Sequence, residues 1–300
     1  MIDRHPLVLR AEQIAANLQP LQQRLTEIDR NAYFQRIGYS GDCSPRLTTL
    51  QAIHQKHSQT IAFENLNSLL KQPVKLDLAS LQQKLIRERR GGYCFEQNSL
   101  LRDVLLALGF QVKNLAARVL WNLPSGTIAP RSHMVLWVNI DGEPYIADVG
   151  FGGLTLTTPL ALTPDIEQAT SHESFRFIAT DRTYIMQAYI KQEWKPLYRF
   201  DLIEQELPDY EVSNWYVSTH PNSIFVTNLM AAKPDSNCRY ALWNNQFTVH
   251  YLDGRTEHRI LSTVAELRAT LENVFCLNLG AIADLDRMLQ QLIERWCAMT

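Results

Sequence analysis

The chain has 300 residues, of which 46% are hydrophobic and 20% charged, and its formal net charge at pH 7 is −2. This composition is typical of soluble globular proteins, and the absence of a basic stripe argues against nucleic-acid binding. No apolar run approaches the roughly 20 residues that a membrane-spanning helix needs, and charged residues near the N-terminus argue against an export signal. The five cysteines are scattered without a CxxC pair. This pattern favours a reducing, cytoplasmic location and argues against a disulfide framework and a zinc site.

The first third of the chain is predicted to be helical. Residues 1–26 form an N-terminal extension, either a loosely amphipathic helix or a partly ordered arm. Apolar spacing predicts helices within residues 27–60 and over residues 78–89. His54 and His57 stand three residues apart, which would allow a metal pair on one helix face. Because no third ligand lies nearby, one packed and one exposed histidine is the expected arrangement, and no metal site is predicted.

The stretch from Arg90 to Asn98 contains a pair of glycines followed by a cysteine, and the cysteine opens an apolar run with helical period. Gly91 and Gly92 permit positive φ or a close approach of the backbone to another group. The run predicts a helix that begins near Cys94 and ends at Gly109. In the first turn of a helix, free N–H groups and the helix dipole favour a thiolate. A single cysteine is otherwise more often a small buried hydrophobic residue.

After Gly109 the hydrophobic period changes from that of helices to that of strands. Strands are predicted over residues 112–120, 133–140, 145–149, 175–179, 184–190, 197–200, 224–231, 239–243, 247–251 and 259–261. Helices are predicted over residues 208–216, from the capping box of Thr263 and Glu266 to about residue 277, and over residues 285–296. Helices followed by antiparallel strands and then strands with terminal helices indicate an α+β protein. The predicted parts are residues 1–26, 27–110, 111–215 and 216–300.

A hairpin brings a histidine and an aspartate together. Asp141-Gly142 is a strong signal for a two-residue turn. Such a turn places His133 and Asp148 on the same face of the sheet as diagonal neighbours, roughly 7–8 Å apart at the backbone. A carboxylate in an otherwise apolar strand needs a partner, and the Nδ1–H of His133 is a suitable one. A pair without a catalytic role, or an exposed pair at a sheet edge, is the structural alternative.

Cys94, His133 and Asp148 together supply the parts of nucleophilic catalysis. The thiolate attacks, the imidazole takes and returns a proton, and the carboxylate fixes the histidine tautomer. A nucleophile at a helix start with partners on a sheet is a papain-like arrangement.

At this point the sequence resembles the arylamine N-acetyltransferases. The resemblance runs from about residue 33 to residue 279 and rests on motifs that occur in the family's order. They are YFQRIGY at 33–39, HQKH at 54–57, IAFENL at 61–66, the RGGxCxExN signature at 90–98, His133, DVGFGG at 148–153 and NWYVSTHP at 214–221.

The resemblance implies a helical bundle carrying Cys94, a central antiparallel β-barrel-like domain carrying His133 and Asp148, and a C-terminal α/β lid. It also implies a ping-pong reaction in which acetyl-CoA acetylates Cys94 and CoA leaves. An arylamine, a hydrazine or an N-hydroxyarylamine then takes the acetyl group. A His133 imidazolium beside Cys94 would keep the thiolate populated at neutral pH.

Other matched residues receive roles from the same resemblance. Glu64 and Arg90 are expected to form a structural ion pair, and Asn98 is expected to bond the backbone. Phe63 and Phe151 are candidates for the aromatic substrate pocket, against plain core packing. The expected cofactor contacts are Gly152, Gly153, Thr219 and Ser223.

Two other readings of the site stay open. The same triad serves cysteine hydrolases and transglutaminase-like proteins, and a non-catalytic binding protein could keep the fold. Small-molecule partners are expected, with no nucleic acid and no membrane, in a monomer or a homo-oligomer. The acceptor amine, the preference between N- and O-acetylation and the acyl chain are not fixed by the sequence.

Overall fold

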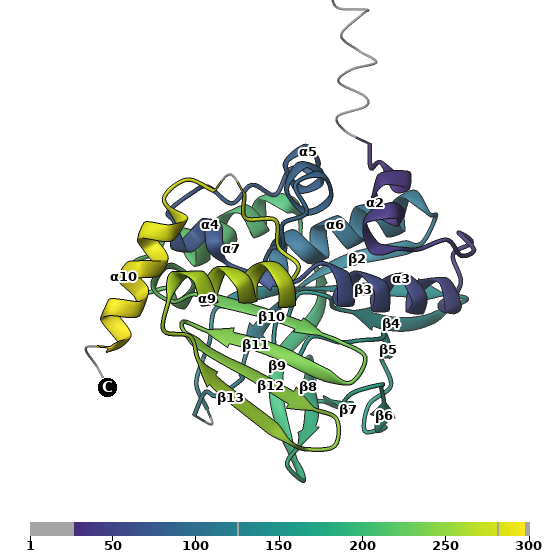
Figure 1. Ribbon diagram of the computed structural model, residues 1–300. Coiled ribbons are helices and arrows are strands. Elements are labelled where there is room, and N and C mark those ends of the chain that lie inside the picture. Colours follow the sequence, from purple (N-terminus) through teal and green to yellow (C-terminus); the bar gives the residue numbers. More distant parts are fainter. Residues whose placement is uncertain (1–26, 125, 281, 298–300) are drawn as a thin grey trace, which may run out of the picture.

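Helices form one side of the molecule and two antiparallel sheets form the other (Figure 1). The structure is a computed structural model that describes residues 27–124, 126–280 and 282–297. The predicted N-terminal extension, residues 1–26, lies outside the described residues. The fold is α+β with a β-barrel-like sheet, as the sequence predicts.

The first third of the described chain is helical, and α2 shows how local residues cap such a helix. Its helices are α2 (Arg30–Ile37), α3 (Leu47–Thr60), α4 (Leu66–Leu69), α5 (Leu78–Leu81) and α6 (Cys94–Ala107). The Asp29 side chain accepts from the N–H of Ala32, and Gly38 ends α2 at φ 65°. The predicted α-helix over 78–89 is only partly correct, since α5 continues as a π-helical segment, Gln82–Arg87.

Eight strands form the larger sheet, in the order β5-β4-β3-β2-β9-β8-β7-β6. Their bounds are β2 (Gln111–Val119), β3 (Arg131–Ile140), β4 (Glu143–Ala147), β5 (Leu160–Ala161), β6 (Gln168–Ala169), β7 (Ser174–Ala179), β8 (Tyr184–Ile190) and β9 (Glu193–Glu204). The predicted hairpin register is confirmed, because Leu136 pairs with Ala147 and Ile140 with Glu143. The predicted strand over 145–149 ends too late, since β4 ends at Ala147 and Asp148 follows directly after it.

Both faces of β3 are buried, against two different cores. Met134, Leu136 and Val138 pack with α6 in the core beneath the helices. Val135 belongs to a second core between the strands of the larger sheet, and Trp137 packs against that core. His133 shares the face of Val135, and its ring lies beside Tyr198 of this second core.

The smaller sheet joins distant parts of the chain, in the order β1-β10-β11-β12-β13. Its strands are β1 (Phe63–Glu64), β10 (Met230–Pro234), β11 (Cys238–Trp243), β12 (Gln246–Tyr251) and β13 (Thr256–Ile260). Strand β1 was not predicted, and it pairs with β10 across a long sequence separation. The predicted strand over 224–231 is wrong in its first half. Ser223 caps a short helix there, α8 (Ile224–Thr227), because its hydroxyl accepts from the N–H of Phe225.

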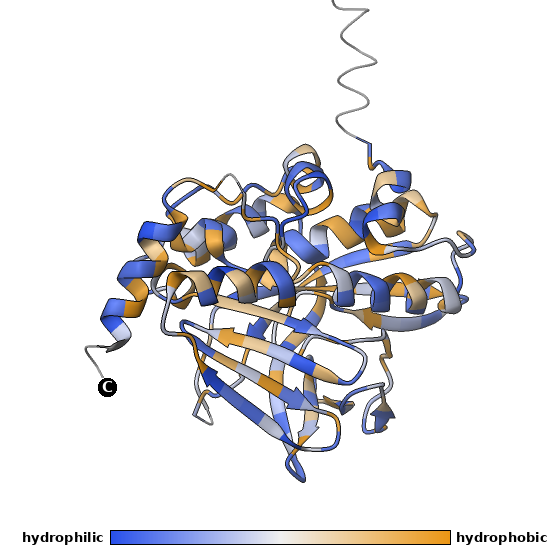
Figure 2. Cartoon of the chain, viewed as in Figure 1, coloured by the Kyte–Doolittle hydropathy of each residue, from blue (hydrophilic) through white to orange (hydrophobic). Residues whose placement is uncertain are grey.

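The remaining helices are α7 (Leu207–Thr219), α9 (Val264–Ala269), which continues as a π-helical segment (Thr270–Val274), and α10 (Leu285–Cys297). The predicted capping box of Thr263 and Glu266 begins α9. Hydrophobic and hydrophilic residues lie side by side along α10 (Figure 2), and Leu289 and Leu292 are buried in the core under the smaller sheet. Within the described ranges, no helix has the length and apolar character needed to cross a membrane.

Candidate active site

Cys94 is the first residue of α6, as predicted, and only 3% of its surface is exposed. The helix start is fixed by Glu96, whose carboxylate accepts from the N–H of Tyr93 at 3.0 Å. The Cys94 sulfur lies 3.7 Å from the carbonyl oxygen of Ser132, the residue before His133. The start of α6 therefore places the thiol directly at the beginning of β3.

His133 and Asp148 form the predicted pair, with His133 Nε2 donating to Asp148 Oδ2 at 2.8 Å. The expected donor, Nδ1, is wrong. Because His133 bonds the carboxylate through Nε2, the other ring nitrogen remains for Cys94, whose side chain interacts with the ring and raises the pKa of His133. The three side chains thus form a continuous chain from sulfur through imidazole to carboxylate.

The Asp148 carboxylate is held by further donors. Its Oδ1 accepts from Asn98 Nδ2 and from the N–H of Gly150, both at 2.9 Å. Asn98 also donates to the carbonyl of Met134 and accepts from the N–H of Val149, so the expected backbone role is confirmed. These bonds connect α6, β3 and the segment after β4 around one buried carboxylate.

Charge interactions outweigh burial at the histidine. Burial alone would lower the pKa of His133, but the Asp148 carboxylate and the Cys94 side chain raise it to about 10. Burial would raise the pKa of Asp148, but His133 and the hydrogen bonds from Asn98 and Gly150 hold it below its usual range. At neutral pH, His133 is therefore an imidazolium and Asp148 a carboxylate.

Aromatic rings surround the imidazole. The Phe151 ring meets His133 edge-on at a centroid distance of 5.2 Å, and the Tyr198 ring lies 5.0 Å away on β9. Phe63 is half-buried and lies 6.2 Å from the ring of Phe225. Tyr198 was not found from the sequence, because nothing in a short apolar strand shows that β9 lies beside the histidine.

Glycines permit close approaches of the backbone around Cys94. A Cβ atom on Gly150 would lie 2.7 Å from Cys94 Cα, and one on Gly91 would lie 2.1 Å from the carbonyl oxygen of Ala62. Gly91 and Gly92 therefore serve close packing, and neither adopts positive φ. Gly152 does, at 85°, and packs on Phe63. A Cβ atom on Gly153 would have no neighbour within 4 Å.

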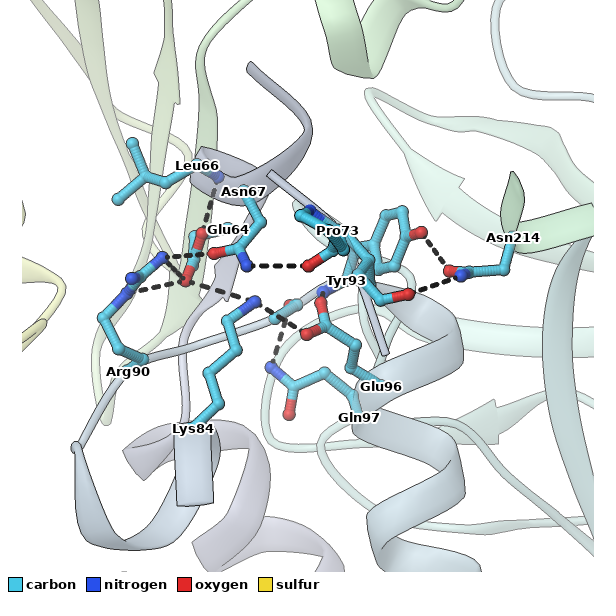
Figure 3. A network of polar contacts seen from close by, with 12 residues as sticks. Glu64, Leu66, Asn67, Pro73, Lys84, Arg90, Tyr93, Glu96, Gln97 and Asn214 are labelled. Carbon is cyan, nitrogen blue, oxygen red and sulfur yellow. Dashed lines mark hydrogen bonds and ion pairs between the residues drawn. The ribbon is translucent and has the colours of Figure 1, made fainter. Parts of the chain in front are cut away.

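The predicted ion pair of Glu64 and Arg90 is present and forms part of a larger network (Figure 3). Arg90 donates to Glu64 Oε1 through Nε at 3.1 Å and Nη2 at 2.7 Å. Lys84, which the sequence analysis did not identify, donates to Glu96 at 2.6 Å and lies 3.8 Å from Glu64. Burial would raise the pKa of Glu64, but Arg90 and Lys84 lower it. The network ties β1 to the start of α6.

The two expected cofactor hydroxyls are engaged within the chain. Thr219 donates to the carbonyl of Trp215, and Ser223 donates to that of Val217. Thr219 is exposed, whereas Ser223 is buried at the start of α8. Their contact with a cofactor remains a prediction.

His54 and His57 are both buried, so the expected exposure of one of them is wrong. His54 Nε2 accepts from the N–H of Asp148 at 3.2 Å, and His57 bonds Tyr33 at 2.8 Å and Gln97 at 2.7 Å. Across the part of the chain that the structure describes, no group of three potential metal ligands is found.

Comparison with known proteins identifies relatives of the chain. A sequence model of an N-acetyltransferase family matches residues 46–284. An arylamine N-acetyltransferase of Escherichia coli is 42% identical over 250 residues, covering 82% of this chain and 88% of that protein. A Salmonella typhimurium relative, named arylamine N-acetyltransferase / N-hydroxyarylamine O-acetyltransferase, is 35% identical and covers 84% of this chain and 90% of its own.

The solved structure of Mycobacterium marinum arylamine N-acetyltransferase in complex with CoA superposes with a TM-score of 0.85 at 38% identity, covering 89% of this chain and 99% of that one. The fold and these relatives define an acyltransferase. The chain belongs to the arylamine N-acetyltransferase family.

Proposed function

We propose that the enzyme acetylates arylamines and hydrazines from acetyl-CoA by a ping-pong mechanism, with Cys94 carrying the acetyl group as a thioester. The observation that carries the proposal is the buried Cys94–His133–Asp148 chain with a protonated histidine. The CoA complex of the Mycobacterium marinum relative supports acetyl-CoA as the donor. The name of the Salmonella relative supports O-acetylation of N-hydroxyarylamines as a further activity.

The first half-reaction transfers acetyl to sulfur. The Cys94 thiolate attacks the acetyl carbonyl of acetyl-CoA, a bond forms between Sγ and the carbonyl carbon, and the bond to the CoA sulfur breaks. The departing CoA thiolate takes the proton of the His133 imidazolium, leaving neutral histidine and the acetyl-enzyme. One thioester replaces another, so the acetyl group is stored at nearly equal free energy.

The second half-reaction uses the neutral histidine as a base. The amine nitrogen attacks the Cys94 thioester, and His133 accepts the proton that the amine loses. The carbon–sulfur bond breaks, which releases the acetylated amine and restores the thiolate beside an imidazolium. Asp148 stays ionised and holds the ring in the orientation that both steps need.

The predicted binding roles complete the proposal. Phe63 and Phe151 present aromatic surface near the triad for an arylamine ring. Space beside Gly153 supports approach of the acyl donor at the Gly152-Gly153 turn. Thr219 and Ser223 are further proposed cofactor contacts. The enzyme is proposed to act in the cytoplasm without a metal, a nucleic acid or a membrane, as a monomer or a homo-oligomer.

Mass spectrometry of the intact protein after incubation with acetyl-CoA tests the mechanism. We expect one added acetyl group on the Cys94 peptide, which an arylamine then removes. Cys43→Ala and Cys276→Ala, which alter exposed cysteines, serve as matched controls and should retain the activity. A hydrolase would give no stable transfer to the amine, and a binding protein would give no adduct. Amine acetylation that survives in Cys94→Ala would refute the role of Cys94.

A further inference from the structure

A second cleft lies apart from the triad, between the turn after α4 and helices α7, α8 and α10. Its volume is about 780 Å³, and its lining includes Lys71, Asn214, Trp215, Thr227 and Arg295. This volume lies within the range of small-molecule sites.

The charge on the cleft has one sign. Lys71 and Arg295 are the charged groups among its described lining residues, and neither has a carboxylate partner in the described ranges. Arg295 Nη1 donates to the carbonyl of Thr227 at 3.2 Å, which directs the guanidinium to this wall. Two cations that line a cleft without a carboxylate favour an anionic ligand.

A neighbouring cleft of about 700 Å³ provides a contrast. Its cations, which include Lys84 and Arg90, face Glu88 and Glu96 across the same space. Lys84 and Arg90 are already paired with buried carboxylates. That cleft therefore combines cations with carboxylates, whereas no carboxylate is among the described lining residues of the cleft beside Lys71 and Arg295.

An aromatic surface accompanies the two cations. The Trp215 side chain lines the cleft and is 65% exposed. An exposed indole beside cationic groups suits a ligand that combines a planar ring with a phosphate, since the ring stacks on the indole while the phosphate meets the cations.

The inner wall of this cleft is connected to the nucleophile. Asn214 Nδ2 donates to the carbonyl of Val74 at 2.9 Å, and its Oδ1 accepts from the hydroxyl of Tyr93. Tyr93 is the residue before Cys94 (Figure 3). A ligand in the cleft would thus contact the side chain that positions the start of α6.

We propose that this cleft binds a phosphorylated planar ligand of nucleotide size. The adenosine phosphate end of the acyl donor and a free adenine nucleotide share this chemistry. If the donor is the source, the inference rests on the proposed function. If a free nucleotide is the source, the cleft is an effector site that acts through Asn214 and Tyr93.

Calorimetric titration of the full chain with adenosine 3′,5′-bisphosphate tests the proposal. We expect the affinity of the double variant Lys71→Ala/Arg295→Ala to fall at least about tenfold and the binding to weaken with added salt. The matched control Lys75→Ala/Arg287→Ala removes the same charge outside this cleft and should bind as the parent does. Lys71→Ala alone, in an exposed turn, repeats the test without disturbing the Arg295 hydrogen bond.

Two further titrations separate the parts of the proposal. Trp215→Ala should weaken binding of the bisphosphate and leave that of inorganic pyrophosphate unchanged. If the donor is the source, the bisphosphate competes with acetyl-CoA and the double variant raises KM for acetyl-CoA without a change in kcat. If a free nucleotide is the source, it binds without competition and KM is unchanged.

Absence of bisphosphate binding, or equal affinity in the parent and the double variant, would overturn the proposal. Equal affinity of Trp215→Ala and the parent would overturn its planar-ring part. Mass spectrometry measures the acetylation of Cys94 by saturating acetyl-CoA in a separate experiment. A failure of the proposed ping-pong mechanism is therefore distinguished from a failure of ligand binding in this cleft.

Discussion

At the scale of single residues, His133 has a charge state that its surroundings decide. An exposed histidine with an ordinary pKa is mostly neutral at pH 7. Here a fully ionised carboxylate 2.8 Å from Nε2 overcomes the effect of burial and raises the pKa to about 10. The same side chain can therefore begin the reaction as an acid and continue it as a base once CoA has left.

Replacing this histidine should slow the chemistry of Cys94. We expect His133→Gln to reduce alkylation of Cys94 by iodoacetamide at least about tenfold at pH 6–7, because the imidazolium that favours the thiolate is removed. The difference should shrink toward pH 9–10, where thiols ionise unaided and His133 itself loses its proton. Peptide mass spectrometry measures the rate, with the exposed Cys43 as internal reference. Equal rates in both proteins at pH 6–7 would argue against the ion pair.

At the scale of elements, the first turn of α6 and the segment after β4 are pressed together. The contact depends on Gly150, where a Cβ atom would lie 2.7 Å from Cys94 Cα. Asn98, one turn further along α6, holds the same segment through Asp148 and Val149. The Asp148 carboxylate therefore lies beside α6 only because Gly150, two residues later, is small enough to contact the helix.

Enlarging that glycine should displace the site. We expect Gly150→Ala to lower the free energy of unfolding by about 1–3 kcal/mol, as overpacking does, and to change the rate at which iodoacetamide alkylates Cys94, because the sulfur and the imidazole move apart. Gly153→Ala is the matched control, since its Cβ atom meets nothing within 4 Å. Urea unfolding and Cys94 alkylation measure the two effects. Gly150→Ala with the stability and reactivity of Gly153→Ala would contradict the packing argument.

At the scale of the whole molecule, buried histidines make stability depend on pH. Burial lowers the pKa of His54 to about 3 and that of His57 to about 4. The unfolded chain binds protons at these residues near pH 6.5, whereas the folded chain does not. Stability is thus fully present above pH 6.5 and falls with pH below it, by about 1.4 kcal/mol per pH unit for each histidine. His133, with its raised pKa, acts in the opposite sense, and its contribution is lost as pH rises toward 10.

Removing one buried histidine should flatten the acid side of this profile. His57→Gln should lower stability at pH 7 through imperfect bonds to Tyr33 and Gln97. It should also reduce the loss between pH 6 and 4.5 by about 2 kcal/mol. Urea unfolding at several pH values measures the slope, with the exposed His258→Gln as control. A slope unchanged by His57→Gln would show that this residue is not the source of acid sensitivity.

Much of the architecture follows from local sequence. The turn Asp141-Gly142 fixed the register of β3 and β4, and with it the shared face of His133 and Asp148. Apolar period and the glycine pair placed Cys94 at a helix start. These features are local, because turn geometry and side-chain alternation act over a few residues. The motif order identified the family in the same way.

Tertiary structure alone decided how these parts meet. It selected Nε2 of His133 for the carboxylate, placed Tyr198 beside the ring and brought Lys84 to Glu96. It also paired β1 with β10 and turned the start of the predicted strand over 224–231 into α8. Each outcome depends on packing between segments far apart in the chain, and no local pattern of hydrophobic residues, turns or caps contains that information.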